Sequence, residues 1–552
     1  MLRSLVSATL AALVLAPLPA RAQHEAPAAH QHAAGAGHEQ LGTVDFATSC
    51  SAAAKPVFNR AVALLHSFEF GDAIKGFTAT LAADPSCAMA EWGIALSRWG
   101  NPFNLAQRAP GPLQEGLAAA LRGKALKPAT PREQAYLDAV AALFTSADTI
   151  DQRTRIVAYR DAMAAVAAAN PADVEAQIFY ALSIAASHTP SDKTYANLLK
   201  AAAILEGLIE KYPDHPGLAH YIIHSYDVPA LADRALVAAR RYATIAPSAP
   251  HALHMPSHTF TRVGSWQESI DTNIASANAA RAVGATAEEL HAMDYQAYAA
   301  LQTGQDAIAR ELVAALPAIK ARFDADAVTG AAPGSAGLFA MASIPARYAL
   351  ERGDWKAAAA LTPEPTRFLY PEAQTWFAKA LGAAHGGDAA ATRAAIAELL
   401  RIRDELTAKK EAYWAEQADI QRRAASAWLA LAEGRTADAL TEMVAAAQAE
   451  DGTDKAAVTP GPLAPARELV GEMLLQAGKA DEALQAFEAT LAKEPNRFRA
   501  LSGAIRAATL AGRTDTARRH AQTLLAICAK ADTPSRRASS PRPARAGPVR
   551  PP

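Results

Sequence analysis

The chain has 552 residues, more than one compact core usually needs, so its length predicts either several domains or an extended array. Hydrophobic residues make up 51 % of the sequence, much of it alanine, and aromatic residues only 6 %, which favours helices over sheets. The formal net charge is −1, with acidic and basic residues interspersed, and this excludes nucleic-acid binding as a main function.

The first 22 residues have the pattern of an export signal. Arg3 precedes an apolar stretch from Leu5 to about Leu18, and the tripeptide ARA at 20–22 forms an A-x-A cleavage site. The apolar stretch is short of the ~20 residues that a spanning helix needs, which favours cleavage over an uncleaved anchor. We expect a signal peptide at 1–22, a periplasmic or secreted mature protein, and no transmembrane segment after cleavage.

Two terminal segments have compositions that do not favour a packed core. Residues 23–44 are small, polar and His-bearing, and residues 531–552 are rich in proline and arginine. Neither segment offers enough apolar area to offset the entropy of ordering, so we expect a disordered leader and a disordered tail.

The cysteines indicate one disulfide. Cys50 and Cys87 lie 37 residues apart, about one repeat length, and an exported protein folds in an oxidising compartment. We expect them to be bridged, the alternative being two buried thiols. Closing a loop of this size is worth roughly 3 to 4 kcal/mol on the chain-entropy model. Cys528 lies outside this pairing.

Small, aromatic and proline residues recur at the spacing of tetratricopeptide (TPR) repeats. In residues 465–497, Gly471 falls twelve residues before Ala483, Phe487 four after it and Pro495 twelve after it. The same spacing recurs twice earlier in the chain, with Ala73, Phe77 and Pro85 and with Ala238, Tyr242 and Pro250. Small residues let paired helices approach and proline ends the second helix. The predicted fold is all-α: a TPR-like solenoid of helical hairpins, wound as a right-handed superhelix with a concave groove.

Changes in this pattern divide the chain. We expect an N-terminal TPR-like helical array at 45–326, divergent helical hairpins with Gly/Pro-rich loops at 327–460, and C-terminal TPR repeats at 461–530. The irregular stretch 449–466 is interpreted as a solvent loop between two helical blocks. The alternative is a lid over the groove, with Asp451 and Lys455 as ligand contacts.

Five histidines fall within 39 residues. His220 and His224 are four apart, as are His254 and His258, so each pair lies on one helix face. The pairs are 34 residues apart, one TPR length, which places them side by side in successive repeats. A 31-residue register, aligned on Ser269, would instead pair His220 with His251, and Pro256 is expected to delay or kink the helix start. In either register the histidines should face the concave groove.

These residues are candidates for a metal site. Neutral imidazole nitrogens with one carboxylate are the ligands that zinc or copper takes, so we expect the metal set His220, His224, His254 and His258 with Asp294. Four further polar residues lie near these stripes, and we expect them to contact a bound ligand: His251, His291, Tyr295 and Asp227.

Three functions remain open for the cluster: groove residues that pack or contact a peptide or small ligand, a divalent-metal site, or a metal-dependent or acid/base enzyme. Neither a zinc-hydrolase H-E-x-x-H nor a G-x-S-x-G, P-loop or dinucleotide fingerprint occurs in the sequence. The sequence therefore predicts no particular reaction, and whether the protein is an enzyme stays uncertain.

Four blocks carry a resemblance to known proteins: "TSCSAAAKPVFNRAVALLHSFEFGDA", "DPSCAMAEWGIAL", "HALHMPSHTFTRVGSW" and "AVTPGPLAPARELVGEM". With these blocks the chain resembles a group of exported bacterial tetratricopeptide proteins without assigned activity, over most of residues 43–515. The resemblance implies the TPR fold and export. TPR proteins in general bind a protein or peptide ligand in the groove, usually with Lys, Arg and Asn, whereas here histidines take those places. We expect an exported binding scaffold, the alternative being a metal-dependent periplasmic enzyme.

Overall fold

The structure, a computed structural model, describes residues 39–532. Every regular element in this range is helical, and no strand occurs between residues 39 and 532, so the predicted all-α fold is confirmed. The predicted signal peptide at 1–22, most of the predicted leader and most of the predicted tail lie outside the described residues. Among residues 39–532, no helix combines the length and apolarity needed to cross a lipid bilayer.

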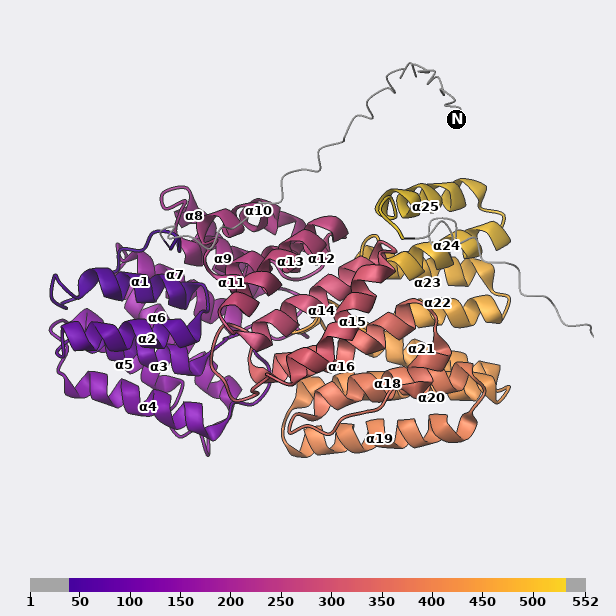
Figure 1. Cartoon of the computed structure of the whole chain (residues 1–552), viewed down its shortest axis with the longest axis horizontal. Helices are drawn as coiled ribbons and strands as arrows, with labels where there is room; N and C mark the ends of the chain where they lie inside the picture. The colour runs from indigo at the N-terminus through magenta and orange to yellow at the C-terminus, as the bar shows by residue number, and fades with distance from the viewer. Residues whose placement is uncertain (1–38, 533–552) are drawn as a thin grey trace, which may run out of the picture. The chain divides into compact units, whose positions relative to one another are not determined.

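The first eight helices pack consecutively, each against the next (Figure 1). They are α1 (Lys55–His66), α2 (Phe70–Ala83), α3 (Ala88–Trp99), α4 (Pro110–Ala125), α5 (Pro131–Ala142), α6 (Gln152–Ala169), α7 (Val174–Ala186) and α8 (Ala196–Ile209). In addition α3 contacts α5, and α7 contacts α9, the next helix along the chain. Alternate helices therefore stack on one another, as the hairpin pattern predicts.

The middle of the chain is built from shorter helices. They are α9 (Pro216–Ser225), the 3-10 helix η1 (Ala232–Ala235), α10 (Leu236–Ile245), α11 (Pro250–His254), α12 (Pro256–Arg262), α13 (Trp266–Ala282), α14 (Thr286–Gln302) and α15 (Asp306–Lys320). The expected interruption at Pro256 is present, because one helix ends at His254 and the next begins at Pro256.

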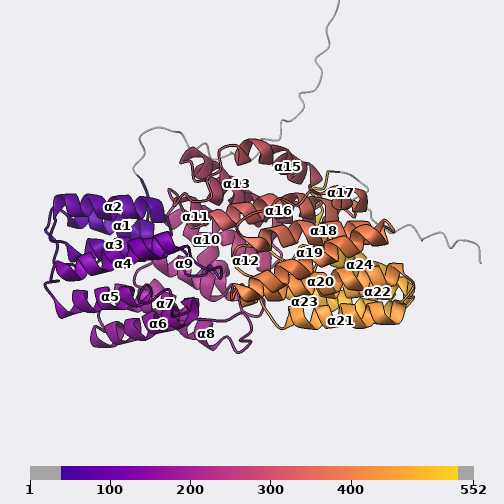
Figure 2. The ribbon, with the colours of Figure 1, turned by 90° about the horizontal axis from the view of Figure 1, so that it is seen from below.

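The remaining helices continue the stacking. They are α16 (Gly334–Glu351), α17 (Trp355–Ala360), α18 (Leu369–His385), α19 (Ala389–Ala408), α20 (Ala412–Ala432), α21 (Thr436–Asp451), α22 (Ala466–Gln476), α23 (Ala480–Lys493), α24 (Phe498–Leu510) and α25 (Thr514–Ile527). Here α14 packs on α16, α16 on α18 and α18 on α20. Figure 2 shows α16, α18 and α20 one beside the next, and from α20 to α23 each helix contacts the next in the chain.

The residues of the TPR pattern pack as their spacing predicts. Phe487 on α23 fills the space left by Gly471 on α22, where an added Cβ would lie 2.8 Å from the ring. Ala483 and Phe487 are both fully buried. A side chain at 471 would push the two helices apart, so glycine at this position allows the hairpin to close.

The buried apolar residues form more than one core. The first runs from Leu41 to Phe260, and the second takes most of its members from Phe339 to Ala508. Smaller clusters around α13 and α14 lie between these ranges in the sequence. Each core involves neighbouring helices, which is how a repeat array buries its apolar faces.

The predicted disulfide is confirmed: Cys50 is bonded to Cys87, with their Cα atoms 4.8 Å apart. The leader prediction is wrong at its end. Gln40 donates from its backbone to Ser248 Oγ at 2.8 Å, Thr43 donates to the carbonyl of Asp214 at 2.9 Å, and Leu41 is buried. Leu41 gives this segment the apolar anchor that its composition as a whole did not suggest.

Candidate metal centre

Six histidines gather where α9, α11, α12 and α14 meet. His220 and His224 come from α9, His251 and His254 from α11, His258 from α12 and His291 from α14. All six side chains are buried, none more than 6 % exposed. The expectation that they face an open groove is therefore wrong, although the expected meeting of rings from successive repeats is observed.

His220, His224 and His251 form a first triad. One ring nitrogen from each residue can be chosen so that all three atoms lie within 4.8 Å of one another. The Nε2 atoms of all three rings are buried, and none of them has a hydrogen-bond partner within the described part of the chain. Buried polar atoms are nearly always paired, so three orphaned nitrogens at one point need an explanation.

Neighbouring groups decide which nitrogen of two of these rings carries the proton. His220 Nδ1 lies 2.6 Å from the backbone carbonyl oxygen of His66, which can only accept. His251 Nδ1 lies 2.9 Å from Oε1 of Glu288. Both rings are therefore held with the proton on Nδ1, leaving Nε2 with a bare lone pair. The close approach of α9 to α1 that allows the first contact requires Gly217, since an added Cβ would lie 2.5 Å from Nδ1 of His66.

His254, His258 and His291 form a second triad, in which one ring nitrogen from each residue again lies within 4.8 Å of the others. His254 Nδ1 donates to Oδ1 of Asn273 at 2.7 Å, an oxygen identified because the Asn273 amide nitrogen donates to Ser269. His258 Nδ1 donates to Asp227 Oδ2 at 2.9 Å. The two Nε2 atoms then face each other at 3.1 Å as two lone pairs. This contact is repulsive unless a cation lies between the rings.

His291 completes the second triad from α14. Its ring centroid lies 4.5 Å from that of His254 and 5.3 Å from that of Tyr295. The triads adjoin each other, because the His224 and His258 rings are 5.9 Å apart and the His251 and His254 rings 5.8 Å.

The grouping differs from the predicted set of four. His251 belongs with α9 and His254 with α14, although both residues lie on the short helix α11, before the break at Pro256. His220 meets His251 as the 31-residue register predicts, while His224 meets His258 as the 34-residue register predicts. Each expected ligand pair is thus completed by a histidine that we had expected only to contact a ligand.

Burial lowers the pKa of all six imidazoles, and their mutual repulsion lowers it further for most of them. The rings are therefore neutral near pH 7, the form in which imidazole nitrogen binds a metal. Burial also raises the pKa of Glu69 and Glu288, two carboxyl groups that both contact His251.

Asp227 is the ionised carboxylate of the site. Burial alone would raise its pKa, but Lys455, Arg262 and His258 lower it well below its usual range. Arg262 Nε donates to Oδ1 at 2.8 Å, and Lys455 Nζ lies 3.5 Å from the same oxygen. Asp227 thus supports His258 from behind, as carboxylates do for metal-binding histidines.

Asp294 does not take part, and its assignment as a ligand or base is wrong. Its carboxylate is held by Arg347, with Nε 2.8 Å from Oδ1 and Nη2 3.5 Å from Oδ2, and both side chains are buried. Asp294 lies three positions after His291 on α14, so the two side chains are neighbours on the helix surface. The carboxylate is nevertheless bound by the arginine from α16.

The loop at 452–465 covers the cluster, so its interpretation as a solvent loop is wrong. Tyr295 Oη lies 2.9 Å from the carbonyl oxygen of Ala457 and 3.1 Å from that of Thr459. Arg347 Nη2 donates to Oγ1 of Thr459 at 2.8 Å, and Lys455 reaches Asp227. These contacts hold the loop against α14, α16 and the segment that follows α9. The loop therefore covers the cluster as the lid alternative expects, with Lys455 paired to Asp227. Asp451 instead pairs with Arg467 at the surface.

A cavity opens onto both triads. His224, His251, His258 and His291 line it together with Phe103 and Trp414. It encloses about 480 Å³, a volume that includes space open to solvent. Four of the six rings therefore border this space.

A third group consists of His66, Glu175 and His215. Both imidazoles contact the carboxylate through Nε2, at 2.9 and 3.0 Å, and His66 Nδ1 lies 3.0 Å from the Tyr221 hydroxyl. Burial lowers the pKa of His66, while Glu175 opposes that shift. In this group only Nδ1 of His215 is buried without a partner among the described residues, so a single nitrogen, and not a convergent set, is left unpaired.

Several residues that hold the rings were missed by sequence reasoning. Glu288 lies three residues before His291, a spacing that could have indicated a shared helix face. Asn273 and Glu69 carry no such signal, because they belong to α13 and to the segment before α2. Their role depends on how the helices pack.

No protein-family model matches the chain, and no curated protein matches it at a significant level. Among solved structures it is similar to the APC/C hetero-tetramer Cut9-Hcn1, with 12 % identity over 82 % of this chain and 76 % of that chain and a TM-score of 0.35. It is also similar to the human IFIT1 dimer with m7Gppp-AAAA, with 10 % identity over 81 % of this chain and 90 % of that chain and a TM-score of 0.36. Cut9 and IFIT1 are TPR-repeat proteins. At these scores the likenesses carry no argument, and the fold rests on the helices described above.

Proposed function

We propose that this protein is an exported TPR-like scaffold that binds transition-metal ions, one in each histidine triad. The observation that carries the proposal is the meeting of buried imidazoles: the three Nε2 atoms of the first triad have no partner among the described residues, and the Nε2 atoms of His254 and His258 face each other at 3.1 Å. Four rings are held with the proton on Nδ1, and their lone pairs point toward neighbouring imidazoles. A bound cation satisfies all of these atoms at once.

The distance between two nitrogens of the second triad fits a bound metal ion and not a bound water molecule. Two nitrogens bound to one tetrahedral zinc at 2.0–2.1 Å are about 3.3 Å apart. The Nε2 atoms of His254 and His258 are 3.1 Å apart, close to this value and too close for a water to lie between them. A shared proton would require one ring to be charged, which burial opposes for both.

The ligand set favours zinc or copper. Imidazole nitrogen suits both metals, and three such ligands leave a position open in a tetrahedral site. Two carboxyl groups lie behind the rings, Asp227 at His258 and Glu288 at His251, and Glu69 accepts a hydrogen bond from the backbone nitrogen of His251. This is the usual second layer of a histidine metal site.

The test is the metal content of an untagged chain that begins at Glu39, which removes the leader histidines and keeps the compact unit from Gln40 onward. We expect two tightly held ions per chain after exposure to zinc or copper and removal of excess metal. His251→Ala and His258→Ala should each remove one ion, and the double variant both.

His385→Ala is the matched control. His385 is another histidine of a helix whose Nε2 is buried without a partner, but it stacks on Trp355, outside both triads. This variant should retain both ions. A chain that takes up neither metal, or that loses metal equally in all variants, would contradict the proposal.

A second candidate function, a metal-dependent enzyme, is favoured by the cavity that four of the rings line. An enzyme needs a coordination position that a small molecule can reach. Copper(II)-loaded protein titrated with azide would show a new charge-transfer band if such a position is open. An unchanged spectrum would argue for a binding protein with closed metal sites.

A further inference from the structure

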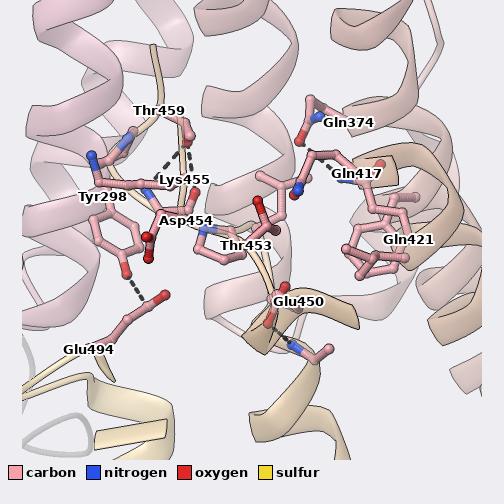
Figure 3. Close-up of a pocket in the computed structure, with 18 of the residues that line it drawn as sticks. Tyr298, Gln374, Gln417, Gln421, Glu450, Thr453, Asp454, Lys455, Thr459 and Glu494 are labelled. Atoms are coloured by element: carbon pink, nitrogen blue, oxygen red, sulfur yellow. Dashed lines mark hydrogen bonds between the residues drawn. The ribbon is translucent and has the colours of Figure 1, made fainter. Parts of the chain in front are cut away.

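A second and larger cavity lies between α18, α20 and the loop at 452–465 (Figure 3). It encloses about 950 Å³, a volume that includes space open to solvent. Figure 3 shows Gln374, Gln417 and Gln421 on one side, facing the loop residues Thr453 and Lys455. Trp414 borders both this cavity and the one beside the histidines.

The charged side chains around this cavity are already engaged by the protein. Asp454 is bound by Lys193 at 2.8 Å, and Lys455 lies 3.5 Å from Asp227. Glu494 accepts a hydrogen bond from the Tyr298 hydroxyl at 2.8 Å, and Glu450 accepts one from the backbone nitrogen of Ala466 at 2.7 Å. A charged ligand would have to displace one of these partners, which costs free energy.

Apart from the carboxylate of Asp454, which is paired with Lys193, the unsatisfied polar atoms of the wall are neutral. Trp414 Nε1, Gln417 Nε2 and Gln421 Oε1 are buried, and none has a hydrogen-bond partner among residues 39–532. They lie three and four residues apart on α20, so they share one helix face. Gln421 is further held by its amide nitrogen, which donates to Oε1 of Gln374 at 3.3 Å.

We propose that this cavity binds a small uncharged ligand with amide groups. The indole and the Gln417 amide nitrogen would donate to its carbonyl oxygens, and Gln421 Oε1 would accept from its N–H group. The three residues span seven positions of a helix, about 10 Å, which is the length of two or three amide units. Phe339 and Phe377 give the cavity an apolar wall for the rest of the ligand.

This inference is independent of the proposed metal sites, and the experiment uses metal-free full-length protein. The probe is N-acetyl-leucine amide, measured by isothermal titration calorimetry against two charged analogues, N-acetyl-leucine and leucine amide. We expect the neutral diamide to bind at least tenfold more tightly than either analogue. Equal binding of all three, or no binding of the diamide, would overturn the proposal.

Substitutions locate the binding. Gln417→Leu and Gln421→Leu should each weaken the diamide about 3- to 10-fold, the loss of one neutral hydrogen bond. Trp414→Phe keeps an aromatic ring to stack on Tyr370 but removes the indole N–H. We expect a similar loss of affinity for the diamide.

Trp428→Phe is the control, because Trp428 lies on the same helix and has a buried Nε1 without a partner, yet does not line this cavity. It should leave binding unchanged. Equal losses in Trp414→Phe and Trp428→Phe would place the probe elsewhere and overturn the proposal. A capped hexapeptide that binds more tightly than the diamide would identify a polypeptide segment as the source of the amides, and its exclusion would identify a small molecule.

Discussion

At the residue scale, the site depends on which imidazole nitrogen carries the proton. Each locked ring has an acceptor behind it: a backbone carbonyl for His220, Glu288 for His251, Asn273 for His254 and Asp227 for His258. These acceptors direct four lone pairs inward. Because the rings are already ordered before a ligand binds, the entropic cost of fixing their side chains on binding is smaller.

Asn273→Ala tests this arrangement. Without its acceptor the His254 ring can rotate or change tautomer, so metal affinity at the second triad should fall 10- to 100-fold. Competition with a chromophoric chelator measures the affinity. Asn278→Ala, an exposed asparagine on the same helix, should leave it unchanged. Equal affinities for Asn273→Ala and the unmodified protein would show that the acceptor does not orient the ring.

A different residue gives a pH dependence. Burial raises the pKa of Glu450 to about 7, while Lys493 opposes the shift. Between pH 4.5 and about 7 the folded protein therefore keeps a proton on Glu450 that the unfolded chain releases above pH 4.5. The contribution of this proton to the free energy of unfolding is fully present below pH 4.5 and is lost as the pH rises through 7.

Glu450→Gln removes this proton while keeping an oxygen for the backbone of Ala466. Between pH 5 and pH 8 the unmodified protein should lose about 2 kcal/mol more unfolding free energy than the variant. Denaturant unfolding at both values measures the difference. Identical pH profiles would show that Glu450 is ionised in the folded state at both pH values.

At the scale of elements, the loop at 452–465 connects parts of the chain that are far apart in sequence. Tyr295 on α14 contacts carbonyl oxygens 162 and 164 residues further along. The loop has no regular structure of its own, and side chains of α14, α16 and α20 form hydrogen bonds with its backbone. It forms one wall of the cavity beside the histidines and one wall of the larger cavity.

Tyr295→Phe should loosen this loop. The variant removes one hydroxyl and leaves buried carbonyl oxygens of Ala457 and Thr459 with fewer donors, which costs about 1–3 kcal/mol. Hydrogen exchange of residues 453–463 should accelerate, while that of α13 should not. Tyr348→Phe, a tyrosine on α16 whose ring lies under Arg352, is the control and should change neither.

At the scale of the whole molecule, the helices stack without regard to the divisions in the sequence pattern. Nearly all members of the first core lie between Leu41 and Phe260, although the array was expected to run to 326, and nearly all members of the second lie in the divergent hairpins and the C-terminal repeats. A TPR pattern identifies the helices that pair. It does not determine where one buried cluster gives way to the next.

The sequence predicted the fold and the disulfide well, because both depend on local spacing: Gly471 with Phe487, and two cysteines one repeat apart. It also predicted that histidines from successive repeats meet. It missed the division into triads, because His251 and His254 lie on one short helix but pack against different neighbours. It missed the Arg347–Asp294 pair and the covering loop, since both join segments that no local pattern relates.

Metal binding should stabilise the whole described fold, because a ligand that binds only the native state adds to its unfolding free energy. At a free metal concentration 100 times Kd, each site contributes about 2.7 kcal/mol. The thermal unfolding midpoint should rise with zinc or copper concentration and stop rising in the His251→Ala, His258→Ala double variant. A midpoint that ignores metal in the unmodified chain would contradict binding to the native state.

The position of the covering loop along the chain has a consequence for assembly. The six rings are complete once residue 291 has folded onto its neighbours, but their cover begins only at residue 452. Domains generally acquire structure from the N-terminus during synthesis or translocation. For the interval between these two points the rings face solvent, so a refolding chain should capture ions faster than the finished protein, and stopped-flow uptake into both forms would measure the ratio.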